Sequence, residues 1–301
     1  MIEQPLVINV ILNTSRRDDT LACLESLAAS SYPRQQTIVL DNASTDGSAE
    51  AIRARYPQVQ VIPLTRNLGY AGNNNAGIRA ALEAGADWVF VLNEDTVLDP
   101  DCTSRLVETA VLSEKTGILG PLVYHGSEPG TIQSAGGALD GHWQPVHIGQ
   151  NEADIRQFTS PREVDWISGC AILVRREVID QVGALDERFF YYWEETDWCL
   201  RARQAGWLVV QVPQAKLWHK GVQRDYRPGP NITYYAARNK LMLMAKHRAP
   251  ASAWAYTYLN AARTLLSWTV RPRWRGMKDH RTALWQGMLD FSFHRYGRRR
   301  D

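Results

Sequence analysis

The sequence of 301 residues predicts an α/β fold, a doubly wound and mostly parallel sheet followed by a helical, basic and aromatic C-terminal extension. Three observations predict this fold. Short β-branched or apolar runs alternate with segments of helical periodicity over residues 6–92. Polar side chains follow the ends of those runs, where a parallel sheet binds its ligands. After Pro228-Gly229-Pro230 the chain becomes helical, aromatic and basic.

Hydrophobic periodicity and turn residues place the elements in order. Strands are expected at residues 6–13, 37–40, 59–64, 88–92, 170–174 and 208–212, and the first of them is expected to be fully buried. Helices are expected at residues 17–29, 48–56, 71–84 and 195–205, and around Glu177. Gly85 closes the third of these helices. Residues 120–161 are rich in Gly, Pro, His and Trp, and we expect loops or small hairpins there.

The charge is distributed unevenly. The net charge is only +2, so the chain as a whole is no polyanion binder, and nucleic acid is not expected as a partner. The C-terminal segment nevertheless carries Arg271, Arg273, Arg275, Lys278, Arg281, Arg295, Arg298, Arg299 and Arg300 with few acids between them. A basic C-terminal segment on an otherwise near-neutral chain favours an anionic membrane surface as a binding partner.

The chain divides into two expected parts, an α/β domain at residues 1–227 and a membrane-proximal helical extension at residues 228–301. The most apolar stretch, residues 249–270, is interrupted by Pro250, Asn260 and Arg263, so it does not suit a transmembrane span. We expect an interfacial helix instead, whose aromatic side chains at headgroup depth are Trp254, Tyr256, Tyr258 and Trp268.

The beginning of the chain and its cysteines bear on the compartment. Residues 1–5 lack the basic region of a signal peptide. The four cysteines form no C-x-x-C pair, which favours small core residues over a zinc or redox site. The expected location is the cytoplasm, at the inner face of the cell membrane.

The first functional motif is Asp41-Asn42-Ala43-Ser44-Thr45-Asp46-Gly47-Ser48. A carboxylate at the end of a buried strand can accept a hydrogen bond from the imide N–H of uracil or thymine. A helix cap and tight turn would explain Ser44 or Asp46, but would explain Asp41 less well.

The second motif, Asn67-Leu68-Gly69-Tyr70-Ala71-Gly72-Asn73-Asn74-Asn75, combines glycines with uncharged donors and acceptors. It suits either a ligand-binding backbone or a glycine-rich helix start. It lacks the Gly-Lys-Ser/Thr of a phosphate loop, and no glycine-rich turn follows the first strand, which disfavours a nicotinamide enzyme.

Two acidic clusters complete the set. Asn93-Glu94-Asp95 ends the fourth strand and offers oxygen ligands for a divalent cation, or else a solvated turn. Glu194-Glu195-Thr196-Asp197 follows an aromatic run, and mutual repulsion and exclusion of water there would raise a carboxylate pKa and suit a general base. The alternative is acidic enrichment in the first turn of a helix. His219 is either structural or a ligand.

Taken in order, these motifs resemble the family 2 glycosyltransferases, which have the GT-A fold, over about residues 6–221. Segments similar to the acceptor and base region of the family are Ser168-Gly169-Cys170-Ala171, Gly183-x-Leu185-Asp186-Glu187-x-Phe189-Phe190 and Glu194-Glu195-x-Asp197-x-x-x-Arg201. Tyr234-Tyr235-x-x-Arg238-Asn239-Lys240 and the basic tail are most similar to bacterial rhamnosyltransferases that use dTDP-rhamnose.

The resemblance assigns a role to each candidate residue. It implies a nucleotide-sugar site formed by Asn13, Asp41, Asn67, Gly69, Asn73, Asn93 and Glu94, with Asp41 holding the base. It implies Mg²⁺ or Mn²⁺ held by Asp95 and His219, and it places Glu195 at the position of the catalytic base. Two departures follow. The family usually has Asp at position 195, which leaves Glu194 and Asp197 as alternative bases, and Asn93 replaces the first acid of the metal motif.

The implied reaction is inverting transfer of a sugar, with rhamnose as the sugar of the most similar subgroup. The donor is a dTDP- or UDP-sugar, and the acceptor is a hydroxyl of a cell-surface glycan or lipid-linked precursor. Two alternatives remain. The two departures keep open an inactive protein that binds sugar nucleotides or tethers a complex to the membrane. A nucleotidyltransferase, which would release pyrophosphate, is the other.

Overall fold

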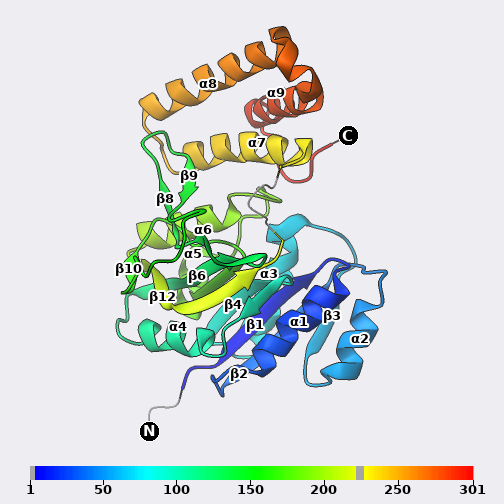
Figure 1. Ribbon diagram of the computed structural model, residues 1–301, viewed down its shortest axis with the longest axis vertical. Coiled ribbons are helices and arrows are strands. Elements are labelled where there is room, and N and C mark those ends of the chain that lie inside the picture. Colours follow the sequence, from blue (N-terminus) through cyan, green and yellow to red (C-terminus); the bar gives the residue numbers. More distant parts are fainter. Residues whose placement is uncertain (1–3, 222–226, 301) are drawn as a thin grey trace.

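The computed structural model describes residues 4–221 and 227–300 (Figure 1). Its main element is a ten-stranded mixed sheet with the order β10-β12-β6-β11-β4-β1-β2-β3, to which β5 and β7 are attached at the sides of β12 and β6. A short separate ribbon joins β8 and β9. The predicted α/β fold with C-terminal helices is confirmed.

The N-terminal half of the sheet is parallel and follows the predicted alternation. Its strands are β1 (Val7–Asn13), β2 (Gln35–Asp41), β3 (Gln60–Pro63) and β4 (Trp88–Asn93). The helices between them are α1 (Arg17–Ala28), α2 (Ser48–Arg55) and α3 (Gly69–Glu83). Every residue of β1 is buried, which agrees with its continuous apolar run. The carboxyl ends of β1, β2 and β4 therefore meet at one edge, and the site lies there.

The C-terminal half of the sheet mixes strand directions. Its longer strands are β6 (Thr116–His125), β11 (Ala171–Arg175) and β12 (Leu208–His219), and β11 runs antiparallel between β4 and β6. The shorter strands are β5 (Thr96–Leu98), β7 (Glu128–Ser134), β8 (Gly137–Leu139), β9 (Pro145–His147) and β10 (Arg162–Glu163). The helices are α4 (Cys102–Ala110), α5 (Arg176–Val182) and α6 (Glu194–Gln204).

The expectation of loops or small hairpins over residues 120–161 is wrong at its start. β6 runs through residues 116–125, and all ten of its residues are buried. Gly120 and Pro121 lie inside this strand because Gly120 makes room for Ile167, whose Cγ2 would be 2.1 Å from a Cβ at that position. Later residues do form the expected hairpin-like ribbon of β8 and β9.

Apolar side chains cover both faces of the sheet. One cluster packs α1 and α4 against β1, β4 and β12, and the other packs α3 and α6 against the opposite face. Cys23, Cys102, Cys170 and Cys199 are all buried and unpaired, as expected of small core residues. These two layers hold the strand ends rigidly.

The C-terminal segment forms a helical layer above the sheet edge (Figure 1). Its elements are α7 (Pro230–Lys246), α8 (Ala251–Val270), the 3₁₀ helix η1 (Pro272–Met277) and α9 (Lys278–Ser292). Among the described residues, no helix is both long and apolar enough to cross a bilayer.

The expected headgroup positions of Trp254 and Trp268 are not supported by the packing of α8. The ring of Trp254 lies 6.0 Å from that of Phe291, and the ring of Trp268 lies 6.2 Å from that of His280, so both are directed toward α9. Tyr256 and Tyr258 remain about two-fifths exposed.

Candidate active site

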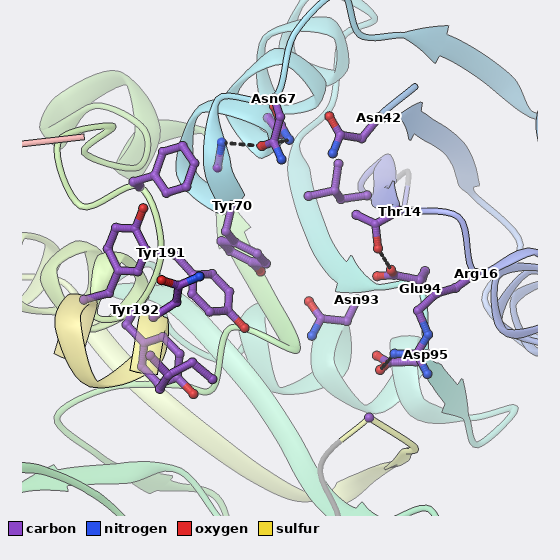
Figure 2. Close-up of a pocket in the computed structure, with 18 of the residues that line it drawn as sticks. Thr14, Arg16, Asn42, Asn67, Tyr70, Asn93, Glu94, Asp95, Tyr191 and Tyr192 are labelled. Atoms are coloured by element: carbon purple, nitrogen blue, oxygen red, sulfur yellow. Dashed lines mark hydrogen bonds and ion pairs between the residues drawn. The ribbon is translucent and has the colours of Figure 1, made fainter. Parts of the chain in front are cut away.

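A cleft of about 500 Å³ opens at the carboxyl edge of the parallel strands, beneath the first turns of α7. Figure 2 shows Asn93, Glu94 and Asp95 on one side of it, and Tyr70, Tyr191 and Tyr192 on the other. Its lining residues are Leu12, Thr14, Arg16, Asn42, Asn67, Gly69, Tyr70, Asn73, Asn93, Glu94, Asp95, Phe190, Tyr191, Tyr192, His219, Gly221, Asn231, Ile232 and Tyr235. Seven of the predicted site residues are therefore brought together: Asn67, Gly69, Asn73, Asn93, Glu94, Asp95 and His219.

Asn13 and Asp41 lie at the ends of β1 and β2, just outside this lining. Asn13 Nδ2 donates to Asp41 Oδ1 over 3.0 Å and to Ser44 Oγ over 2.8 Å, while Asn13 Oδ1 accepts from Thr20. Asn13 is thus adjacent to Asp41. Asp41 is 8% exposed and does not itself line the cleft, whereas neighbouring Asn42 does. Asn13 fixes the orientation of the Asp41 carboxylate at the end of β2.

Asn67, Gly69 and Asn73 form the turn that begins α3. Asn67 Oδ1 accepts from Gly69 N over 2.8 Å, and Asn73 Oδ1 accepts from Leu68 N over 2.9 Å. Gly69 has a φ of +76°, and a Cβ there would lie 2.3 Å from the main-chain oxygen of Phe190. Glycine is therefore required at this position because the main chain of the loop at residues 189–193 lies so close. The sequence had suggested either close approach to a ligand or a glycine-rich helix start, and Gly69 is the first residue of α3.

Asp95 and His219 face each other across the strand ends. His219 Nδ1 is 3.1 Å from Gln133 Oε1, and its Nε2 lies 3.0 Å from Asp95 Oδ1. The contact with Gln133 fixes the orientation of the ring. A ring nitrogen and a carboxylate oxygen thus face each other, and both are atom types that bind divalent cations.

These residues fit a divalent cation. Ligands bound at about 2.1 Å and at right angles are about 3.0 Å apart, which is the separation of His219 Nε2 and Asp95 Oδ1. Within residues 4–221 and 227–300, no cluster of three or more His, Cys, Asp or Glu could hold a metal by itself. Further ligands would come from substrate phosphates, as is common for Mg²⁺ sites.

Arg16 is a site residue that the sequence did not indicate. Its Nη1 lies 2.5 Å from Asp95 Oδ2, and its Nη2 pairs with Asp19. Burial by itself would raise the pKa of Asp95, but neighbouring His219 and Arg16 outweigh it and lower that pKa. Gly221 closes this corner, because a Cβ there would lie 2.0 Å from Asp95 Oδ2. Asp95 is thus anionic and tightly enclosed.

Glu94 lies on the same side of the cleft as Asp95, but its environment differs. Thr14 Oγ1 donates to Glu94 Oε1 over 2.6 Å, an interaction drawn in Figure 2. Burial raises the pKa of Glu94, and the hydrogen bond from Thr14 acts in the opposite direction. Asn93 Nδ2 lies 3.4 Å from His219 Nε2, so the Asn93 amide contacts the ring that faces Asp95.

Glu194 and Glu195 begin α6, behind the Tyr70 side of the cleft. Burial raises the pKa of Glu195 to about 7. Burial and the charge of Glu195 raise the pKa of Glu194, whose Oε2 is buried without a described partner. A Cβ at Gly169 would lie 3.4 Å from the Tyr70 hydroxyl and 3.5 Å from Glu195 Cγ, so these groups are neighbours. Glu195 therefore lies near Tyr70, which lines the cleft, but neither Glu194 nor Glu195 is itself among the lining residues.

The structure separates Asp197 from the cleft. Its carboxylate is fully buried and is bound by Arg201 at 2.8 Å, Lys246 at 2.9 Å and His247 at 2.8 Å. Burial acts to raise the pKa of Asp197, but these three partners outweigh it and lower that pKa. Asp197 thus joins α6 to the end of α7, and no free carboxylate oxygen is directed at the cleft.

The aromatic loop at residues 189–193 is held by α7. Phe190, Tyr192 and Trp193 have positive φ values of 65°, 75° and 72°, which are costly for residues other than glycine. Asn239 Nδ2 lies 2.8–2.9 Å from the main-chain oxygens of residues 189, 191 and 192. Arg238 Nη2 also donates to the oxygen of residue 189, over 2.8 Å. Both side chains are completely buried, so α7 fixes a loop that lines the cleft.

The cleft residues missed from the sequence are Thr14, Arg16, Asn231, Ile232 and Tyr235. Thr14 and Arg16 directly follow the first strand at its carboxyl end, and that position could have indicated them. The three α7 residues lie in the segment assigned to the extension, where no local pattern marks Asn231 or Ile232. Tyr235 belongs to a motif noted in the sequence, but that motif was not expected to line a cleft.

Comparison with known proteins agrees with this geometry. The profile described as "Glycosyl transferase family 2" matches residues 7–183. The "N-acetylglucosaminyl-diphospho-decaprenol L-rhamnosyltransferase" of Mycobacterium tuberculosis is 33% identical over 82% of this chain and 83% of its own. The "dTDP-rhamnosyl transferase RfbF" of Shigella flexneri is 26% identical over 83% of this chain and 85% of its own.

Solved structures show the same fold. A mannosyltransferase from Pyrobaculum calidifontis, in complex with GDP-Man and Mn²⁺, has a TM-score of 0.63 at 15% identity and covers 97% of this chain and 88% of its own. GalNAc-T7 with UDP, GalNAc and Mn²⁺ has a TM-score of 0.69 at 14% identity and covers 97% of this chain and 57% of its own. The sheet and C-terminal helices are those of a GT-A glycosyltransferase, and the chain belongs to glycosyl transferase family 2.

Proposed function

We propose that this glycosyltransferase is an inverting, metal-dependent enzyme that moves a sugar from a dTDP- or UDP-sugar to an acceptor hydroxyl. Rhamnose is the proposed sugar, and a lipid-linked glycan precursor is the proposed acceptor. The names of the two relatives support both choices. The observation that carries the proposal is the pair of facing atoms, Asp95 Oδ1 and His219 Nε2, in the same cleft as the nucleotide-binding strand ends.

The donor would lie across the strand ends. Asp41 would accept the imide N–H of the base, held in place by Asn13, and Asn67, Gly69 and Asn73 would line the nucleotide-sugar path. Asp95 and His219 would hold Mg²⁺ or Mn²⁺, whose chemistry is to neutralise charge on the leaving diphosphate. Asn93 and Glu94 would contact the donor, and Arg16 supplies a second positive charge at this point.

The acceptor hydroxyl would approach beside Tyr70. Glu195, whose pKa is about 7, would take the hydroxyl proton as that oxygen attacks the anomeric carbon and the diphosphate leaves from the opposite side. Glu194 would keep this carboxylate in a poorly hydrated environment. Asp197 would position α6 through its contacts with α7 and would not itself accept the proton.

The proposed division at residue 228 gives a catalytic part and a membrane-proximal part. The first turns of α7 line the cleft, so we propose that the extension also completes the acceptor side. We further propose an anionic membrane surface as its partner. The chain would act at the inner face of the cell membrane.

A direct test is a panel of UDP-, dTDP- and GDP-sugars, assayed for thermal protection of the protein and then for transfer with Mn²⁺ or Mg²⁺. A ligand at a hundredfold its Kd adds about 2.7 kcal/mol of stability. Protection by one donor together with release of the nucleoside diphosphate would support the proposal. Protection without turnover would favour the inactive sugar-nucleotide-binding alternative, and release of pyrophosphate would indicate a nucleotidyltransferase.

A further inference from the structure

A cavity lined by cations lies at the corner between α8 and α9, apart from the candidate active site. Its volume is about 310 Å³, and its walls come from the end of α8, from η1 and from the first turn of α9. The charged residues lining it are all basic: Arg271, Arg275, Lys278 and Arg281. An adjoining hollow adds Arg263 and Arg273.

Within the described residues, no ion pair joins these cations to an acid. None of Arg271, Arg275 and Lys278 forms an ion pair with an acid in the part of the chain that the structure describes. Arg281 Nη1 donates to Thr269 Oγ1 over 3.3 Å, which ties α9 to α8 and shapes the corner. Like charges in one concave corner repel each other, so the arrangement favours a bound anion.

An exposed apolar stripe runs along α8 and ends at the same corner. Leu259, Leu266 and Val270 are 71%, 63% and 62% exposed. Arg263 is also exposed and lies between them at helical spacing, so all four residues share one helix face. The opposite face of α8 packs on α9 through Ala253 and Trp254. Figure 1 shows α8 at the outer end of the molecule, a position that agrees with the high exposure of these side chains.

We propose that this face docks on an anionic phospholipid bilayer, with lipid phosphate in the cavity of Arg271, Arg275, Lys278 and Arg281. Exposed apolar side chains beside cations match the boundary between acyl chains and phosphates. A second copy of the chain fits less well, because a twofold contact centred on the stripe would bring together the two Arg263 side chains. An interfacial helix was also expected from the sequence, but the apolar residues proposed to contact the membrane are now Leu259, Leu266 and Val270.

The docking face is joined to the wall of the cleft. His280, in the first turn of α9, lies 2.8 Å from Thr233 Oγ1, measured from its Nδ1. Thr233 follows Asn231 and Ile232, which line the cleft. If the acceptor is lipid-linked, as proposed above, docking through α8 and α9 holds the α7 wall of the cleft toward the membrane that supplies it.

Cosedimentation of the full chain with vesicles tests the docking proposal. Wild-type protein should bind vesicles of phosphatidylcholine mixed with phosphatidylglycerol, and should bind phosphatidylcholine alone much less. R275Q/K278Q should lower the partition coefficient for mixed vesicles about 25-fold, taking about fivefold for each of the two cations at the surface. L259S/L266S should also lower binding, with the charge unchanged. A matched control, R53Q/R79Q, removes two exposed cations from α2 and α3 and should leave binding unchanged.

Three results would overturn the proposal. These are equal binding of R275Q/K278Q and wild type, equal loss in the control, or full displacement from mixed vesicles by inorganic phosphate at the same phosphate concentration. Self-association abolished by L259S/L266S, without vesicle binding by the wild type, would identify the face as a contact between copies. None of these measurements uses sugar transfer, so normal docking by a protein without transferase activity would reject only the proposed function.

Discussion

Asn239 donates its side-chain amide to the main-chain oxygen of Tyr192, 2.9 Å away and 47 residues earlier in the chain. This contact crosses from α7 to the loop that immediately precedes Glu194 and Glu195. It stabilises a backbone conformation with positive φ at three residues other than glycine. The geometry of the proposed base therefore depends on a helix of the C-terminal segment.

The first prediction concerns this contact. Asn239→Ala should lower the free energy of unfolding by about 1–3 kcal/mol, because buried carbonyls and the Arg238 guanidinium lose a partner. Sugar transfer should fall by more than nucleoside-diphosphate binding, since Asp41 is untouched. Denaturant melts, calorimetry and turnover measure the three quantities. Asn260→Ala, at an exposed position of α8, is the matched control, and equal effects of both variants would contradict the assignment.

The second prediction concerns the base. Glu195→Gln keeps size and hydrogen-bonding reach but cannot accept a proton, so transfer should fall by about 10²–10⁴-fold with donor binding near wild type. Wild-type transfer should rise with pH through about 7, and the residual activity of the variant should not. Glu195→Asp restores the usual family residue and should retain activity if the backbone accommodates the shorter side chain. A pH profile of single-turnover rates measures both.

The same residue predicts a change in stability. Burial raises the pKa of Glu195 in the folded state, so the folded protein binds this proton more tightly than the unfolded chain does. The resulting stabilisation is complete below the unfolded pKa and is lost as the pH rises through about 7. Glu195→Gln should therefore gain stability relative to wild type in melts above pH 7. A loss at that pH would mean that the carboxylate is a structural anion.

The third prediction concerns Asp197: Asp197→Asn should lower the stability of the protein and leave transfer per folded molecule in place. The substitution removes the charge of a buried carboxylate that is bound by Lys246 and two other partners. Loss of one member of a buried ion pair lowers the free energy of unfolding by about 3–5 kcal/mol. Transfer per folded molecule should remain, because no free oxygen of Asp197 is directed at the cleft. If this variant stays folded and inactive while Glu195→Gln remains active, Asp197 is the base.

The fourth prediction concerns the cation. Asp95→Ala should abolish transfer and the Mn²⁺- or Mg²⁺-dependent part of nucleotide binding while leaving the fold intact, and His219→Ala should be less severe. Gln133→Ala frees the ring of His219 and should weaken metal affinity about 10- to 100-fold. Titration of nucleoside diphosphate by calorimetry at graded metal concentrations measures how strongly nucleotide binding by each variant depends on the metal. Normal metal dependence in Asp95→Ala would exclude that ligand.

The fifth prediction concerns recognition of the base. Asp41→Ala should weaken binding of uridine or thymidine diphosphate by about 1.5–3 kcal/mol, the scale of a hydrogen bond to a charged group. Asp46→Ala is a useful comparison, because Asp46 accepts from the main-chain N–H of Arg17 and Ser48 and shapes the turn. That variant should lose stability and keep more of its affinity. Equal affinity of Asp41→Ala and wild type would leave Asp41 a structural residue.

The parallel half of the sheet could be predicted because β1 and β4 are nearly continuous apolar runs and β2 contains a shorter one. β6 was missed because Gly120 and Pro121 interrupt its pattern, and the need for glycine at position 120 comes from Ile167, far along the chain. The antiparallel direction of β11 is likewise fixed by its partners and is not encoded in its own residues.

The site was predictable where residues follow strands directly. Asp95 and Asn67 reach the cleft because parallel strands end at one edge. The α7 wall was not predictable, because Tyr235 enters the cleft only after the C-terminal helices have packed over the sheet edge. The separation of Asp197 from the cleft also depends on Lys246 and His247, about fifty residues away in sequence.

The Arg238–Asn239 contact has an evolutionary consequence. Arg238 and Asn239 of α7 hold residues 189–192 through main-chain oxygens. A chimera joined near residue 227 would therefore combine the loop of one protein with the α7 side chains of another. Recombination between relatives should succeed only when the loop and α7 are exchanged together. Substitutions in these two segments should accordingly be inherited as linked pairs, and the segments should change in step when acceptor preference diverges.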